Sequence, residues 1–243
     1  MAYWAGSRAS RTPWSTSFFS QSNCLGRITL RGVFRPRLFC ALERPLAMLD
    51  PPGKNGGMNH VPERWSESVQ LPDMWLDPDQ DPRDTTEPDP AGECETYARY
   101  LRDYRLTLEL KCEGLAPEQL ARRSVPPSTM SLLGLLRHLG EVERDWRNWI
   151  SDGERIAPIY GGHGADFDGV RPEPECLAQA LQILHEEQHA TDRALANFAD
   201  LGQRVGREEV IVRELQVHRI EEYARHCGHA DLLRECIDGR VGQ

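Results

Sequence analysis

The chain has 243 residues, of which 39% are apolar, and a formal net charge of −9. This length suffices for one sizeable core and is marginal for two domains. The negative charge argues against broad binding to a phosphate backbone, and no window approaches about 18 consecutive apolar residues, so we expect neither nucleic acid nor a membrane as a partner. Seven cysteines without a C-x-x-C pair indicate reduced thiols in the cytoplasm.

Charge is segregated near the start of the chain. Residues 1–47 contain seven arginines and one acid, whereas residues 48–96 contain twelve acids and three bases. Prolines recur in the second block and prevent regular helix, so we expect residues 1–90 to be a largely unstructured extension. One explanation is a start codon placed too far upstream, with Met48 or Met58 as the true start. A basic arm that binds an acidic partner is the alternative.

From residue 91 onward the pattern is helical. Apolar residues recur at helical spacing in "ECETYARYLRDYRLTLELKCEGL", and Gly114 follows where a C-terminal cap belongs. Ser128 or Ser131 begins the next helix. Four amphipathic helices are predicted, at about residues 93–112, 128–152, 174–200 and 208–238. No run alternates convincingly as a strand, so residues 91–243 are predicted to form an all-α domain, an up-down four-helix bundle.

The last predicted helix contains "VHRIEEYARHCGHADLLRE", with three histidines and two adjacent glutamates. On a helical wheel with His218 at 0°, Glu222 falls at about 40°, His226 at about 80° and His229 at about 20°, in the sector of the apolar residues. Glu221 falls at about 300°, among the solvated charges. A buried carboxylate needs a partner or a metal, so Glu222 and His226 are predicted metal ligands.

One helical turn supplies two ligands, and a third must come from another helix. His138, in "LLRHLGEVE", lies on the inward side of the second predicted helix. Two histidines and one carboxylate suit Zn²⁺ with an open coordination position, or Fe²⁺. We expect a divalent metal, with Zn²⁺ first and iron or nickel as alternatives. The competing interpretation is a buried network of His138, Glu222 and His226 without a metal.

Two segments, 110–146 and 217–239, resemble the DinB/YfiT-like superfamily in its actinobacterial DUF664 branch, and the loop "PIYGGHGADFDGV" at 158–170 resembles it more loosely. The similarity covers about residues 94–240. It implies a DinB-type four-helix bundle that holds a divalent metal at one end. In this superfamily one ligand comes from the second helix and two, four residues apart, come from the fourth.

Transferred to this sequence, those ligand positions are His138, Glu222 and His226. The glutamate–histidine pair resembles the mycothiol-dependent maleylpyruvate isomerase type. The resemblance implies a transferase or isomerase that uses a low-molecular-weight thiol such as mycothiol on a small electrophilic substrate, with His229 or His218 carrying a proton.

The sequence also departs from the branch, because Arg219 stands where a methionine is usual and borders the inward face. Cys112 and Cys227 are interpreted as structural. The alternatives to a thiol-dependent enzyme are a metal-dependent hydrolase and a non-catalytic stress or binding protein with a metal-stapled bundle. In the latter, His229 would be a fourth ligand. A homodimer stays open.

Overall fold

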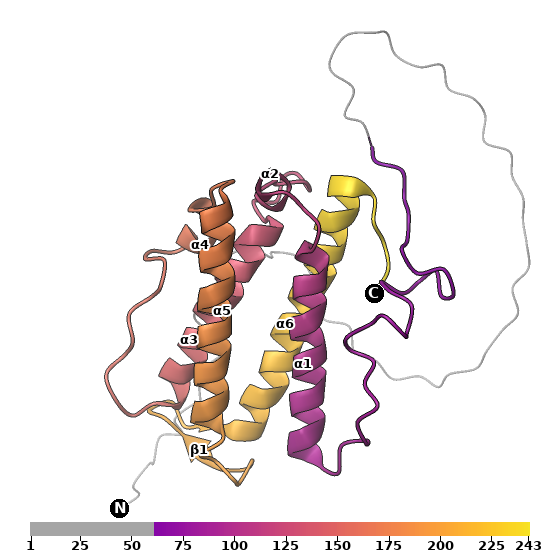
Figure 1. The fold of residues 1–243 in the computed structure, drawn as a ribbon. Helices are drawn as coiled ribbons and strands as arrows, with labels where there is room; N and C mark the ends of the chain where they lie inside the picture. Colours follow the sequence, from indigo (N-terminus) through magenta and orange to yellow (C-terminus); the bar gives the residue numbers. More distant parts are fainter. Residues whose placement is uncertain (1–60) are drawn as a thin grey trace, which may run out of the picture. The chain divides into compact units, whose positions relative to one another are not determined.

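The computed structural model describes residues 61–243, so most of the predicted unstructured extension lies outside the described residues. This part of the chain is mostly helical, as predicted, and its long helices lie side by side (Figure 1). None of the helices in residues 61–243 is long and apolar enough to cross a bilayer.

The described elements are four long helices, two single-turn helices and one short hairpin. In chain order they are α1 (Glu93–Cys112), α2 (Pro117–Leu120), α3 (Leu132–Ile150), α4 (Ala165–Asp168), α5 (Pro174–Leu195), β1 (Arg204–Val205), β2 (Val210–Ile211) and α6 (Val212–Asp238).

Local sequence explains where several helices begin and end. Ser131 begins α3, because its side-chain oxygen accepts a hydrogen bond from the amide of Gly134 at 3.1 Å. Gly114 follows α1 and Gly239 follows α6, and both have positive φ, which glycine adopts without strain. Of the two serines that the sequence offered as a start of the second long helix, Ser131 is the cap.

Two predicted boundaries differ from the structure. Helix α5 ends at Leu195 rather than near residue 200, and the apolar residue Phe198 packs against the core from the following loop. Helix α6 begins at Val212 because the residues before it pair in an antiparallel hairpin, with Val205 opposite Val210. Strands of two residues are too short to show alternation, so the sequence pattern could not reveal them.

The long helices pack chiefly in two pairs, α3 with α5 and α1 with α6, and α3 also contacts α6. Helix α3 supplies much of the core, since its inward residues are almost completely buried; they include Leu132, Leu135, Leu136, Leu139 and Trp146. The α3–α6 contact brings the histidine of the second long helix toward the histidine-rich helix.

Residues 61–90 contain no helix, yet they pack against the end of the chain. Trp65 forms an isolated parallel bridge with Arg240. The indole of Trp75 is 1% exposed, with Lys111 Nζ 3.9 Å and Arg240 Cζ 3.8 Å from its ring centroid. The Trp75 amide also donates to the carbonyl of Gln243 at 3.0 Å.

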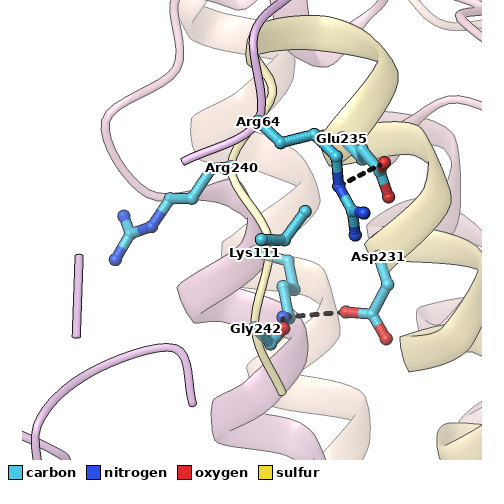
Figure 2. A pocket seen from close by; sticks show the side chains of 7 residues that line it. Arg64, Lys111, Asp231, Glu235, Arg240 and Gly242 are labelled. Carbon is cyan, nitrogen blue, oxygen red and sulfur yellow. Dashed lines mark hydrogen bonds and ion pairs between the residues drawn. The ribbon is translucent and has the colours of Figure 1, made fainter. Parts of the chain in front are cut away.

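A cavity of about 170 Å³ lies beside this contact (Figure 2). Lys111 Nζ lies 2.8 Å from Asp231 Oδ1, and Arg64 Nε lies 3.0 Å from Glu235 Oε1. Burial lowers the pKa of Lys111 despite the nearby carboxylate. The charged side chains around this cavity form ion pairs with one another, and the Arg64–Glu235 pair links the segment of residues 61–90 to α6.

Candidate metal centre

Three polar side chains from α3 and α6 converge between the helices. His138, Glu222 and His226 each offer one ligand atom, and these atoms all lie within 4.8 Å of one another. Glu222 Oε1 lies 3.1 Å from His226 Nε2 and 3.8 Å from His138 Nε2. The structure therefore brings together the three residues that the sequence selected.

The two adjacent glutamates of α6 have the separate environments that the wheel predicted. Glu222 is 5% exposed and His226 is 6% exposed, which places both on the inward face. The Glu221 side chain is 53% exposed and pairs with Arg225 at 2.5 Å. This prediction is confirmed: one carboxylate is buried among histidines and its neighbour is solvated.

Electrostatics in the cluster favour an ionised carboxylate. Burial alone would raise the pKa of Glu222, but hydrogen bonds and charge from His138 and His226 lower it well below its usual range. Burial would lower the pKa of His138, yet its contacts with Asp166 and Glu222 raise that pKa to about 9. Burial and the neighbouring charge of His138 lower the pKa of His226. Glu222 and His226 therefore hold metal-binding protonation states, and His138 must lose a proton.

A fourth residue touches this cluster, and no sequence pattern singles it out. Asp166 lies on α4, inside the glycine-rich loop, and its Oδ2 is 2.7 Å from His138 Nδ1. In the sequence it is marked only as an acidic residue in the loop of residues 158–170, which resembles the family loosely. Which helix a loop residue contacts depends on tertiary packing, and helical periodicity carries no information on it.

The two other histidines proposed from the sequence lie in different surroundings. His229 Nδ1 is 3.3 Å from His226 Nδ1, the ring nitrogen of His226 that does not face Glu222. His218 lies one turn before Glu222 on α6, and its ring stacks on Trp149 at a centroid distance of 5.8 Å. His229 thus contacts the cluster directly, and His218 belongs to an aromatic group with Trp146 and Trp149.

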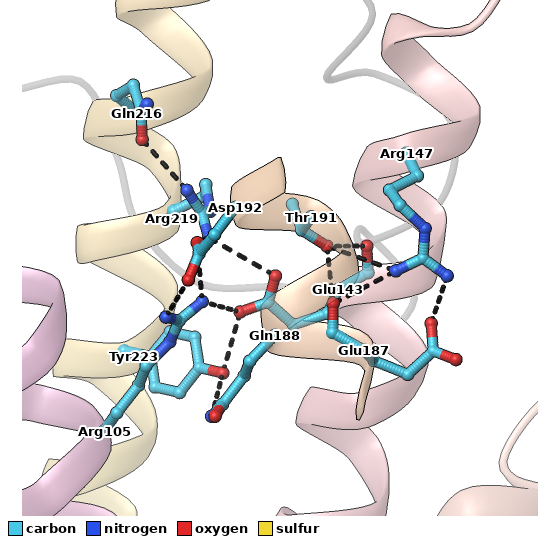
Figure 3. A network of polar contacts seen from close by, with 10 residues as sticks. All are labelled: Arg105, Glu143, Arg147, Glu187, Gln188, Thr191, Asp192, Gln216, Arg219 and Tyr223. Atoms are coloured by element: carbon cyan, nitrogen blue, oxygen red, sulfur yellow. Dashed lines mark hydrogen bonds and ion pairs between the residues drawn. The ribbon is translucent and has the colours of Figure 1, made fainter. Parts of the chain in front are cut away.

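Arg219, the residue that departs from the family pattern, is 2% exposed and part of a buried polar network (Figure 3). It pairs with Asp192 at 2.5 Å, and Arg105 pairs with Glu143 at 2.7 Å. The Tyr223 hydroxyl also donates to Glu143 at 3.0 Å. Arg219 also lies 3.5 Å from Glu143, so its charge is neutralised by a buried acid of α3 and a partly exposed acid of α5.

The cysteines of residues 61–243 are all free thiols. Cys112 and Cys227 are buried, and burial raises the pKa of each thiol to about 12. The Cys227 thiol lies 3.3 Å from the carbonyl oxygen of Tyr104. Cys94 and Cys236 are exposed.

Comparison with protein families matches a family model described as Mycothiol-S-transferase to residues 96–239. No curated protein matches the chain, and neither does any solved structure. The family match spans more than half of the chain and includes α1 through α6 almost entirely. It confirms the resemblance to the DinB/YfiT-like superfamily predicted from segments 110–146 and 217–239.

Proposed function

The chain belongs to the mycothiol-S-transferase family, and on that premise we propose that it is a metal-dependent transferase or isomerase that uses mycothiol on a small electrophilic substrate. The observation that carries this proposal is the convergence of His138, Glu222 and His226 between α3 and α6. The family match supports mycothiol as the thiol, and the three clustered side chains are where a metal would be held.

The donor set fits a divalent metal of the zinc type. Two imidazoles and one carboxylate are ligands that Zn²⁺ accepts while a coordination position stays open, and iron or nickel would also accept them. A bound metal of this kind would lower the pKa of a thiol ligand, so that a thiolate is available at neutral pH. His229 approaches the Nδ1 of His226, whereas Glu222 approaches its Nε2, and this favours an open site over closure by His229 as a fourth ligand.

The chain's own residues would then have separate roles. Glu222 would balance part of the cation's charge, and His138 and His226 would be its two other protein ligands. We propose that His229, or else His218, carries the proton that the thiol or the product exchanges, because His229 contacts His226 and His218 lies one helical turn before Glu222.

The arrangement of the long helices supports the finer fold proposal, an up-down bundle of the DinB type. Its ligands would come from the second and fourth long helices, α3 and α6. We propose residues 91–243 as this bundle, with residues 61–90 packed on it. The free thiols support a cytoplasmic location, and a homodimer remains compatible with the proposal.

The test is metal content followed by thiol dependence. Purified full-length protein should contain about one equivalent of metal per chain, and His138→Ala and His226→Ala should each lose it. His189→Ala, which changes an exposed histidine of α5, is the matched control and should retain the metal. If both cluster variants keep one tightly bound equivalent, the assignment is wrong.

Activity separates the proposed enzyme from a hydrolase with the same ligands. Wild-type protein loaded with Zn²⁺ should consume small electrophiles only when mycothiol is present. Turnover that persists after removal of all low-molecular-weight thiol would instead indicate that the site activates water.

A further inference from the structure

The single-turn helix α4 is held against α3 beside His138, the ligand that α3 contributes to the proposed metal centre. Arg137, the residue before His138, donates from Nε to the carbonyl oxygen of Asp166 at 2.7 Å and from a terminal nitrogen to that of Ala165 at 3.1 Å. The ring of Phe167 lies 5.1 Å from the ring of His138. Backbone and side-chain contacts together therefore hold α4 over this histidine.

Gly134 makes this close approach possible. A Cβ atom at this position of α3 would lie 2.7 Å from Phe167 Cδ1, closer than carbon atoms approach without a shift. The glycine leaves room for the Phe167 ring one turn before His138. Helix α4 is thus seated by shape as well as by hydrogen bonds.

Asp166 is the member of α4 that faces the cluster. Its Oδ2 lies 2.7 Å from His138 Nδ1, and the two side chains are equally buried, at 13% exposure. Glu222 approaches the other nitrogen of the same ring, Nε2, at 3.8 Å. The imidazole of His138 therefore has one carboxylate at each nitrogen, from α4 on one side and from α6 on the other.

We propose that Asp166 is a positioning residue for the metal centre: it accepts the Nδ1–H of His138 and so keeps the Nε2 lone pair directed at Glu222 and His226. This inference rests on the proposed metal site. A neutral imidazole carries its proton on one nitrogen, and the hydrogen bond made by one nitrogen decides that the other is the ligand. Carboxylates that orient a ligating histidine in this way typically contribute about 10–100-fold to metal affinity.

The neighbouring acid of α4 provides the contrast. Asp168 pairs with Arg123 at 2.9 Å, and its side chain is 71% exposed, so it is directed away from His138. The two aspartates share the same short helix and the same charge, and they differ in whether they touch the histidine. A general effect of negative charge or of α4 stability would appear in both variants, whereas positioning of His138 would appear only in Asp166 variants.

The experiment compares Asp166→Ala, Asp166→Asn and Asp168→Ala in the full-length protein. Zn²⁺ affinity is measured by competition with a chromophoric chelator, and the Zn²⁺-bound imidazoles are observed by nitrogen-15 NMR. We expect Asp166→Ala to bind Zn²⁺ about 10–100-fold more weakly. The Nδ1 resonance of its Zn²⁺-bound His138 should shift toward that of an N–H group without a carboxylate acceptor. Asp166→Asn, which keeps an acceptor oxygen and the side-chain shape, should be intermediate, and Asp168→Ala should match wild type.

Equal Zn²⁺ affinity in wild type and both Asp166 variants would overturn the positioning role while leaving the metal site intact. A wild-type protein that binds no Zn²⁺ would overturn the proposed function, and the positioning role with it. Circular dichroism of the metal-free variants checks folding. Should Asp166→Ala unfold, the isosteric Asp166→Asn still decides through its Zn²⁺ affinity and the Nδ1 resonance of its His138.

Discussion

Side-chain direction, more than residue type, decides chemistry at the residue scale in this protein. Glu221 and Glu222 are identical and adjacent, yet one pairs with Arg225 at the surface and the other lies between two histidines. About 100° of helical rotation separates them. The same carboxylate therefore has two different partners and two different expected roles.

Replacing each glutamate with glutamine tests that difference. Glu222→Gln keeps the size of the side chain but removes the charge that would balance a cation, so Zn²⁺ affinity should fall at least tenfold, and thiol-dependent activity should fall with it. Glu221→Gln is the matched control and should change the free energy of unfolding by no more than about 0.5 kcal/mol, as is usual for surface substitutions. Isothermal titration with Zn²⁺ and chemical denaturation provide the two measurements. Equal Zn²⁺ affinity in the two variants would contradict the assignment.

At the scale of single elements, the start of α3 depends on one hydroxyl group. Ser131 is 2% exposed and caps the amide of Gly134, whereas the Ser128 hydroxyl accepts a hydrogen bond from Met130 in the preceding turn. Ser131→Ala should therefore destabilise the protein by about 1 kcal/mol, the usual value of an N-cap. Ser128→Ala should have a smaller effect. Urea denaturation measures the free energy of unfolding of the two variants. An equal decrease in both would contradict the role of Ser131 as the N-cap that stabilises α3.

The segment of residues 61–90 is the second element with a testable contribution. The buried indole of Trp75 lies between cationic side chains of α1 and the chain end, so Trp75→Ala should lower the free energy of unfolding by about 3–5 kcal/mol. Trp65→Ala removes an indole that is 43% exposed and should have a clearly smaller effect. Thermal and urea denaturation of the full-length variants compare them. A negligible change in Trp75→Ala would mean that residues 61–90 are dispensable to the domain.

The sequence predicted elements well where a repeating pattern marked them. The apolar period located all four long helices, and the wheel separated Glu222 from Glu221, because both depend only on helical geometry. The hairpin before α6 escaped prediction because its strands are two residues long. Asp166 escaped because its role follows from how Arg137 and Phe167 seat a loop on α3, a tertiary contact that no local pattern encodes.

At the scale of the whole molecule, ion pairs between helices cross the interior. Glu187 of α5 pairs with Arg144 of α3 at 2.5 Å and also with Arg147, while its own side chain is only 8% exposed. Burial would raise the pKa of Glu187, but the hydrogen bonds from the two arginines lower it below its ordinary value. A carboxylate with a lowered pKa stabilises the folded state at neutral pH.

This linkage has a definite sign. The contribution of Glu187 is fully present above its unfolded-state pKa of about 4.3, and it is lost as the pH falls through the lower folded-state pKa. Glu187→Gln should therefore be less stable than wild type at pH 7 by about 1.5–3 kcal/mol, the range for hydrogen bonds to charged groups. The difference in the free energy of unfolding between wild type and Glu187→Gln should become smaller as the pH falls below about 4. Glu186→Gln changes an exposed neighbour and is the control. A difference in unfolding free energy between wild type and Glu187→Gln that did not vary with pH would contradict the linkage.

The burial of Cys112 and Cys227 has a chemical consequence for a protein of this family. An enzyme that joins a thiolate to an electrophile can have its own cysteine thiols alkylated by that electrophile. A thiol with a pKa of about 12 is almost wholly protonated at neutral pH, and the thiolate is the reactive form. Cys112 and Cys227 are thus unreactive toward the electrophiles that the protein would handle, and within residues 61–243 alkylation would be directed to the exposed thiols of Cys94 on α1 and Cys236 on α6.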